Sequence, residues 1–343
     1  MRIATELLLK LSYILSPVIY DLADFSTNKK FRLRLERNRN KYPYEVLQAV
    51  EEALTKLAHS NYHEFYGHYN YLDWLTSLPW GIYSADNLDI VRAQKILDED
   101  HYGFTDVKER ILEFIAVGKL SGSFAGKIIC LHGPPGVGKT SIGRSIARAV
   151  NRNFFRFSVG GLYDVSEIKG HGRTYSGSMP GKMVQCWKNA GTSNPLVLID
   201  EIDKLGKGRG DPASALLELL DPVQNANFLE HYLGVPIDLS EVLFVCTANN
   251  IDNIPAPLLD RMEVIAITGY TTDEKMHIAI NHLEKFIRKQ CGIKPEHQVL
   301  VTDAALRELI ENYCKEPGVR SLQMHIEKID RKISHLSIEC LRE

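Results

Sequence analysis

The sequence predicts an α/β fold with a parallel five-stranded sheet, a C-terminal helical lid domain and an N-terminal helical segment. Three observations support this class: five short apolar runs, helical patterns between them, and a lack of strand patterns after about residue 270. The runs are residues 127–132, 154–159, 196–200, 242–248 and 264–267. Strands that alternate with helices usually form a parallel sheet covered on both faces, and such strands are continuous apolar runs.

Length and composition bound the domain organisation and the class of protein. The 343 residues suggest about two domains of roughly 150 residues each, with an additional helical segment. We expect the helical segment over residues 1–98, a large α/β domain over 99–269 and a small helical domain over 270–343. The net charge of −2 does not favour nucleic acid as the main partner. None of the six cysteines is spaced as C-x-x-C, which argues against a zinc site and favours a reducing compartment.

The N-terminal segment is predicted to be helical wherever its apolar residues show a regular spacing. Residues 7–20 are apolar, but Lys10 and Pro17 interrupt them, so the run is too short for a bilayer span and fits neither a secretory signal nor a clear transit peptide. Residues 43–58 have apolar positions at helical spacing. The Pro79-Trp80-Gly81 turn should end the next helix.

Two more helical patterns precede the first strand, and the stretch after that strand is the most specific motif of the chain. The two helical patterns cover residues 87–98 and 105–118. The motif is Gly133-Pro134-Pro135-Gly136-Val137-Gly138-Lys139-Thr140, which fits G-x-x-x-x-G-K-[ST] between a strand and a helix over 141–150. Glycines let backbone N–H groups turn inward, and the helix N-terminus adds partial positive charge. We therefore expect Lys139 to reach the β- and γ-phosphates of a nucleotide and Thr140 to place its hydroxyl on Mg²⁺.

An acidic pair closes the third strand, where it would complete the nucleotide site. Asp200 and Glu201 follow the apolar run 196–199. We expect Asp200 to hold Mg²⁺ and Glu201 to act as the general base that polarises the attacking water. Asn249, after the fourth strand, could orient that water.

The C-terminal part is predicted to be three helices. A capping box over Thr271 to Glu274 begins a helix that runs to about residue 288, and Thr302 caps a second helix that runs to residue 313. Glu316-Pro317-Gly318 breaks the chain before a third helix over about 319–341. Arg320 at the start of that helix, and Arg261 before the last strand, are the candidate arginines for phosphoryl transfer.

These residues, in this order, resemble the AAA+ ATPases, which share the phosphate-loop NTPase fold. The resemblance is closer still to the ATPase part of Lon, the family of ATP-dependent proteases, and particularly to its mitochondrial plant type. The stretches that carry it are residues 170–181, 210–218, 255–263 and 318–320, and it extends over about residues 31–340.

The resemblance implies roles for individual residues. Asn249 and Arg320 are similar to the two sensor residues of the family, and Arg261 to the arginine finger that enters the neighbouring subunit's site. His101, Tyr102, Tyr270 and Ile278 match the positions that line the adenine pocket. Tyr175 matches the pore-loop aromatic residue that grips an unfolded polypeptide.

The resemblance also implies cofactors, partners and a location. These are ATP and Mg²⁺, a homohexameric ring, unfolded or misfolded protein substrates, a role in protein quality control and the mitochondrial matrix. No membrane association is implied, and DNA is a partner that the family allows but the near-neutral charge does not indicate. Two positions depart from the family pattern: Gly172 replaces a usual Arg, and Ser176 replaces a usual aliphatic residue, which predicts a weaker grip on substrate. We expect no peptidase catalytic residues within this chain.

Two other functions remain open on the sequence alone. The first is a truncated homologue that binds ATP and acts as a chaperone or regulatory subunit. The second is an ATPase that remodels nucleic acid, which the net charge and the Tyr175 loop disfavour.

Overall fold

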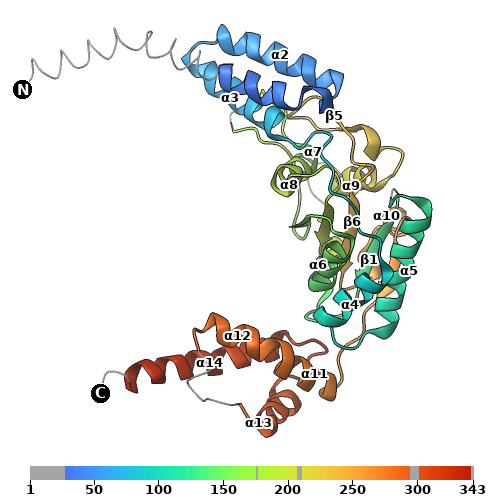
Figure 1. The fold of residues 1–343 in the computed structure, drawn as a ribbon, viewed down its shortest axis with the longest axis vertical. Helices are drawn as coiled ribbons and strands as arrows, with labels where there is room; N and C mark the ends of the chain where they lie inside the picture. The colour runs from blue at the N-terminus through green and yellow to red at the C-terminus, as the bar shows by residue number, and fades with distance from the viewer. Residues whose placement is uncertain (1–27, 125, 175–176, 207–210, 294–300, 341–343) are drawn as a thin grey trace, which may run out of the picture.

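The computed structural model describes residues 28–340, except residue 125 and residues 175–176, 207–210 and 294–300. Figure 1 shows three parts arranged in an arc, with the N-terminal helices at one end, the sheet and its helices in the middle, and the C-terminal helices at the other end. The apolar run predicted at residues 7–20 lies outside the described residues.

The central sheet is parallel and has five strands, as the sequence predicts. The strand order is β2-β3-β6-β1-β7, and all four neighbouring pairs are parallel. The strands are β1 (Ile128–His132), β2 (Phe154–Ser158), β3 (Leu196–Asp200), β6 (Leu243–Ala248) and β7 (Glu263–Ala266). Their bounds differ from the predicted ones by no more than one residue at either end. Because parallel strands end at the same edge of a sheet, the residues that follow β1, β3 and β6 come together there.

Each inner strand is buried on both faces, which explains the continuous apolar runs. In β1, Ile128 and Cys130 pack on one face while Ile129 and Leu131 pack on the other. The second face is covered by α4, α5 and α6, and α7, α8 and α9 lie on the first. The helices of this part are α4 (Ile90–Asp100), α5 (Thr105–Ser121), α6 (Lys139–Val150), α7 (Ser166–Lys169), α8 (Lys182–Ala190), α9 (Pro212–Leu220) and α10 (Ala256–Leu259), with short 3-10 turns at Ile202–Lys204, Asn225–Asn227 and Ile251–Asn253.

The N-terminal helices share one hydrophobic core with the first face of the sheet. They are residues 28–37, α2 (Tyr44–Ala58) and α3 (Tyr62–Ser77), with a 3-10 turn at Arg39–Lys41. Helix α3 ends before Pro79, as predicted. Trp80 packs edge-on against Trp187 of α8 at 5.0 Å between ring centroids, and the Tyr71 hydroxyl donates to the carbonyl of Leu233 at 2.7 Å. The described part of the N-terminal helical segment therefore has no core separate from that of the α/β domain. The domain boundary at residues 98/99 stays a prediction.

The C-terminal helices form a separate small core around Ala279, Leu306 and Leu322. The predicted capping box is confirmed, because Thr271 and Glu274 each bond the other's backbone N–H. Two predicted helices contain a π-helical turn, at Ala279–Leu283 and Leu309–Tyr313. The helices are α11 (Thr272–Ile278), α12 (Glu284–Gln290), α13 (Asp303–Glu308) and α14 (Arg320–Cys340).

A small antiparallel pair that the sequence did not predict holds a buried acid. Strands β4 (Phe228–Leu229) and β5 (Pro236–Ile237) flank Glu230, which is fully buried. Its carboxylate accepts from the N–H groups of Gly181 at 2.8 Å and Leu233 at 2.6 Å. Burial raises the pKa of Glu230 to about 7, and the N–H groups oppose that shift only in part. This residue thus ties the chain after α7 to the β4–β5 turn.

Replacing Glu230 with Gln is expected to change how stability depends on pH. A carboxyl group whose pKa rises from 4.5 to about 7 on folding contributes stability below pH 4.5, and this contribution is lost as the pH rises to about 7. The free energy of unfolding of the wild type, relative to that of the variant, should therefore fall by about 3 kcal/mol across that range. Urea unfolding of both proteins at several pH values measures it. Exposed Glu113→Gln should give no such trend, and a flat difference for Glu230→Gln would contradict the prediction.

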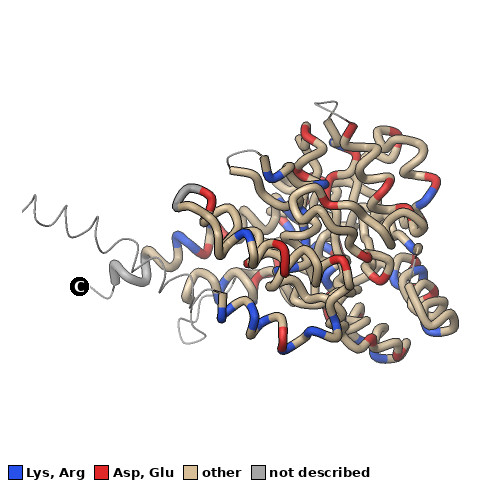
Figure 2. Tube along the Cα trace, turned by 90° about the horizontal axis from the view of Figure 1, so that it is seen from above, with Lys and Arg blue, Asp and Glu red and all other residues tan. Residues whose placement is uncertain are grey.

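Charges of both signs are dispersed over the molecule. Figure 2 shows Lys and Arg interspersed with Asp and Glu along most of the described chain. In the part of the chain that is described, none of the helices combines the length and the apolar character that a membrane span requires.

Candidate active site

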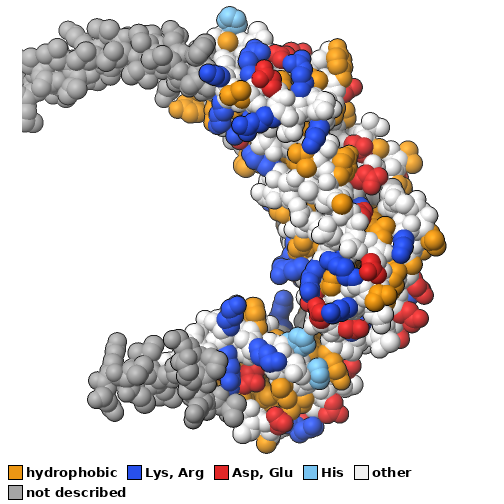
Figure 3. Space-filling model, viewed as in Figure 1, with side chains coloured by type: hydrophobic (Ala, Val, Ile, Leu, Met, Phe, Trp, Pro, Cys, Tyr) orange, Lys and Arg blue, Asp and Glu red, His pale blue; other side chains and the backbone are white. Residues whose placement is uncertain are grey.

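A cavity of about 950 Å³ lies at the carboxyl edge of the sheet, between the strand ends and the lid helices. The predicted site residues that line it are Pro135, Gly136, Gly138, Lys139, Thr140, Asp200, Glu201, Asn249 and Arg320, together with His101, Tyr102, Tyr270 and Ile278. Figure 3 shows Lys and Arg side chains gathered on the concave side of the molecule, near its junction with the lid. The cationic residues among those that line the cavity are Lys139, Arg144, Arg156, Lys204 and Arg320. Such a surface attracts an anionic ligand.

The glycine-rich loop wraps the N-terminus of α6. Gly136 and Gly138 have φ angles of 81° and 91°, a region that favours glycine. A Cβ at Gly133 would lie 2.1 Å from the carbonyl oxygen of Ile267, so this position has no room for a side chain. Val137 is buried beneath the loop. The loop and helix together form a cradle of backbone N–H groups, which fits phosphate.

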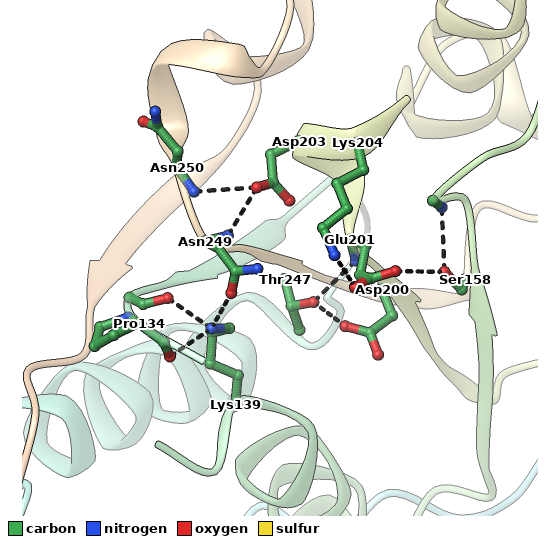
Figure 4. A network of polar contacts seen from close by, with 12 residues as sticks. Pro134, Lys139, Ser158, Asp200, Glu201, Asp203, Lys204, Thr247, Asn249 and Asn250 are labelled. Atoms are coloured by element: carbon green, nitrogen blue, oxygen red, sulfur yellow. Dashed lines mark hydrogen bonds and ion pairs between the residues drawn. The ribbon is translucent and has the colours of Figure 1, made fainter. Parts of the chain in front are cut away.

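Lys139 is folded onto this loop. Its ammonium donates to the carbonyl of Gly133 at 2.6 Å and to that of Pro134 at 2.9 Å. It also donates to Asn249 Oδ1 at 2.7 Å (Figure 4). Burial lowers the pKa of Lys139, and the nearby carboxylates of Asp200 and Asp203 partly oppose that change. All three N–H donors of the ammonium are therefore used within the protein, and at least one of these bonds must break before Lys139 can donate to phosphate.

Both oxygens of Asp200 already have donors. Oδ1 accepts from the hydroxyl of Thr247 on β6 (Figure 4), and Oδ2 accepts from Arg156 Nε on β2 at 2.8 Å. A second guanidinium nitrogen of Arg156 contacts the same Oδ2. The carboxylate is thus held at the end of β3 by residues of the two neighbouring strands.

Glu201 is held in an unusual backbone conformation. Its φ of 60° lies in the left-handed region, which residues other than glycine rarely occupy. Oε2 accepts from Ser158 Oγ at 3.3 Å, and Oε1 pairs with Lys204 (Figure 4). The carboxylate faces the cavity beside Asp200. An observed strained residue of this kind is a candidate for a functional constraint.

Asn249 is fixed on both its backbone and its side chain. Its N–H donates to Asp203 Oδ2 at 3.1 Å, as does the N–H of Asn250 (Figure 4). Its side-chain oxygen accepts from Lys139. Asp203 therefore connects the turn after β3 to the turn after β6.

The predicted adenine-pocket residues line the cavity from both the α/β part and the lid. His101 is buried and contacts Ser145 Oγ through Nε2 at 3.0 Å. Burial lowers the pKa of His101 to about 4, so its ring is neutral at physiological pH. Tyr102 stacks on His277 of the lid at 3.6 Å between ring centroids. Tyr270 donates from its hydroxyl to the carbonyl of Val137 at 3.0 Å, and burial raises its pKa.

The break before α14 packs directly on the phosphate loop. The N–H of Val319 donates to the carbonyl of Gly136 at 3.1 Å. A Cβ at Gly318 would lie 2.5 Å from the carbonyl carbon of Gly136 and 2.6 Å from the oxygen of Pro135. This contact brings Arg320, the first residue of α14, to the cavity.

Replacing Gly318 with Ala is expected to weaken ATP binding by roughly tenfold or more, because overpacking costs about 1–3 kcal/mol and here displaces the phosphate loop. Calorimetric titration with ATP measures the affinity. Gly67→Ala is the matched control, since a Cβ at Gly67 of α3 meets nothing within 4 Å. Equal affinities of the Gly318→Ala variant and the wild type would contradict the prediction.

Of the predicted site residues that the structure describes, those that do not line the cavity are Gly133, Pro134, Val137 and Arg261. Arg261 donates to Asp221 Oδ2 at 3.1 Å and to the carbonyl of Pro257 at 2.7 Å, away from this subunit's own cavity. Tyr175 lies outside the described residues, as does Ser176. The position of Arg261 is compatible with a role in another subunit's site, which stays a prediction.

The sequence reasoning missed several residues of the site. Arg156 and Ser158 lie on one face of β2, and Phe155 and Phe157 lie on the other. Thr247 gave no signal because it lies within an apolar strand, and Lys204 gave none because it lies in a turn with several other charged residues. A signal existed for Arg156 and Ser158, because the polar positions repeat every second residue.

Comparison with known proteins agrees with this geometry. Residues 129–270 match the model of the ATPase family associated with various cellular activities (AAA), and residues 289–339 match the Lon protease AAA+ ATPase lid domain. The chain is 73% identical over 308 residues to the mitochondrial Lon protease homolog of Zea mays, which covers 89% of this chain and 32% of that protein. It is 72% identical over 308 residues to the mitochondrial Lon protease homolog 1 of Arabidopsis thaliana, covering 89% of this chain and 33% of that protein.

A relative outside plants matches the same region. The mitochondrial Lon protease homolog of Mus musculus is 59% identical over 310 residues, which is 90% of this chain and 32% of that protein. The chain thus spans about a third of the length of the curated relatives it matches.

Proposed function

Because the chain belongs to the Lon type of AAA ATPases, we propose that it hydrolyses ATP and couples turnover to the unfolding and translocation of protein substrates. The observation that carries the proposal is the convergence of three elements on one cavity: the phosphate loop, the acidic pair after β3 and the first residue of α14. Proteolysis of the substrate is assigned to the whole Lon protein and not to residues of this chain.

The residues of the cavity fit a nucleoside triphosphate with Mg²⁺. The loop N–H groups and Lys139 would hold the phosphates, and His101, Tyr102, Tyr270 and Ile278 would contact the adenine. The hard oxygen ligands that Mg²⁺ prefers would come from Thr140 and Asp200. When bound, Mg²⁺ would neutralise charge on the β- and γ-phosphate oxygens.

Hydrolysis then depends on groups that this chain supplies around the γ-phosphate. Glu201 accepts a proton from the attacking water, and Asn249 orients that water. Arg320 stabilises the charge that develops on the phosphate oxygens. Each oxygen of Glu201 has one partner, Ser158 or Lys204, and a carboxylate oxygen accepts more than one donor, so Glu201 keeps capacity to accept from a water molecule.

The arginine finger and the pore loop require an assembly. We propose a homohexameric ring in which Arg261 enters the neighbouring subunit's site. Tyr175 would contact an unfolded or misfolded polypeptide in the central pore. A mitochondrial matrix location is proposed because the relatives described above are named mitochondrial Lon protease homologs.

ATP turnover with and without casein as an unfolded substrate tests the proposal. We expect Mg²⁺-dependent turnover that casein stimulates, and native mass spectrometry with a slowly hydrolysed ATP analogue should show a hexamer. Calorimetry that detects no Mg²⁺-ATP binding to folded protein would overturn the proposal. ATP binding without turnover would instead indicate a regulatory subunit, and stimulation by DNA with a steep salt dependence would indicate a nucleic-acid remodeller.

A further inference from the structure

Arg156 of β2 contacts the carboxylate that the proposed metal site would use. Its Nε donates to Asp200 Oδ2 at 2.8 Å, and a second guanidinium nitrogen pairs with the same oxygen. The Asp200 side chain is only 9% exposed, whereas that of Arg156 is 50% exposed. The cation therefore approaches a buried carboxylate from the open side of the cavity, which Arg156 also lines.

The other oxygen of Asp200 is occupied from the opposite side. Oδ1 accepts from the hydroxyl of Thr247. A hydroxyl is neutral and can remain bound when a cation arrives, because a carboxylate oxygen accepts more than one donor. A guanidinium at Oδ2 behaves differently, since its positive charge repels a divalent cation or its water shell at the same oxygen.

The place of Arg156 in the fold gives it freedom to move. Strand β2 is at the edge of the sheet, and Arg156 projects on the same face as Ser158, toward the cavity. Among the described residues, the acceptor of its hydrogen bonds is Asp200. Its departure from Asp200 would thus break no backbone pairing and leave no buried charge of its own.

We propose that Arg156 is a positioning residue that competes with Mg²⁺ for Asp200 and so sets the metal concentration at which the site fills. The metal-loaded nucleotide has to displace the guanidinium before Asp200 can serve as a ligand. This inference rests on the proposed Mg²⁺-dependent ATPase function.

Replacement of Arg156 by Met, which removes the charge and keeps a long side chain, tests the competition. The measurement is binding of a fluorescent, slowly hydrolysed ATP analogue as Mg²⁺ is titrated from EDTA to millimolar concentration. We expect the half-saturating Mg²⁺ concentration to fall by roughly tenfold in the variant, because one unit charge is removed next to the ligand. A rise or no change in that concentration would overturn the proposal.

Two further variants separate this effect from a general change in charge. Arg144 lines the same cavity and stacks on Phe154 at 5.4 Å, so Arg144→Met removes an equal charge without touching Asp200. We expect it to shift the Mg²⁺ midpoint less than Arg156→Met does, and an equal shift would overturn the specific role of Arg156. Arg156→Lys keeps a charge and should lie between the wild type and Arg156→Met.

The outcomes for the wild type distinguish failure of this inference from failure of the proposed function. No binding of the analogue at any Mg²⁺ concentration overturns both, and binding that is independent of Mg²⁺ overturns the metal site and the competition with it. Mg²⁺-dependent binding that Arg156→Met leaves unchanged overturns the competition alone. Thermal unfolding confirms that each variant is folded, and Arg156→Gln replaces Arg156→Met if the latter is not.

Discussion

Replacing Glu201 with Gln is expected to leave ATP bound while hydrolysis slows by roughly 10²–10⁴-fold, the range that a general acid–base group contributes. Gln has the shape of Glu and can still accept from Ser158, but it cannot take a proton from water. The phosphate loop is untouched by the change, because Glu201 contacts Ser158, Lys204 and Thr247 rather than residues 133–140. The substitution should therefore lower the rate of hydrolysis without lowering the affinity for ATP.

Two measurements on the same variant distinguish ATP binding from ATP hydrolysis. Calorimetry with Mg²⁺-ATP gives the affinity, and release of inorganic phosphate gives the turnover rate. Glu263→Gln is a suitable control, since Glu263 is an exposed partner of Arg110 outside the cavity. Turnover of Glu201→Gln near that of the wild type would refute the assignment of the general base.

Replacing Arg261 with Ala is expected to reduce turnover by about 10³–10⁵-fold, the effect of an arginine finger in phosphoryl transfer, with little change in ATP affinity. Arg261 is held by Asp221 and the carbonyl of Pro257, away from its own subunit's cavity. The substitution should therefore leave ATP binding in the same subunit unchanged, and the loss of turnover should occur in the site of the neighbouring subunit.

Mixing two inactive variants tests whether Arg261 acts between subunits. An Arg261→Ala subunit keeps Glu201, and a Glu201→Gln subunit keeps Arg261, so an interface that joins them in the right order contains both groups. We expect turnover to reappear on mixing, to a fraction of the wild-type rate. If Arg261 acts within its own subunit, the mixture should stay as inactive as its components.

The sequence predicted the sheet and the glycine-rich loop between β1 and α6 well because their patterns are local. Strand β3 is a continuous apolar run, and a strand buried on both faces requires one. Within the loop over 133–140, Gly136 and Gly138 are required for a local reason, since their φ angles of 81° and 91° favour glycine. The lack of room at Gly133 comes instead from Ile267, which is distant in the sequence. Helix starts such as Thr271 were also predictable, since a capping box is a local pattern.

The contacts between distant strands were not predictable in the same way. Arg156 and Asp200 are 44 residues apart and meet only because β2 and β3 are neighbours in the sheet. The strand order is decided by packing and by the crossover helices, which leave no short motif. Nor could the sequence reveal that α11 and α12 are joined by a π-helical turn, because that turn depends on how the lid helices pack.

The division of the hydrophobic cores has a consequence for heat denaturation. Since the described helices before residue 81 and the first face of the sheet bury their side chains in one cluster, they should melt together in a single cooperative transition. The helices after residue 270 have a cluster of their own and meet the rest along the nucleotide cavity. They should be able to open as an independent foldon, and a bound nucleotide would then merge two melting steps into one.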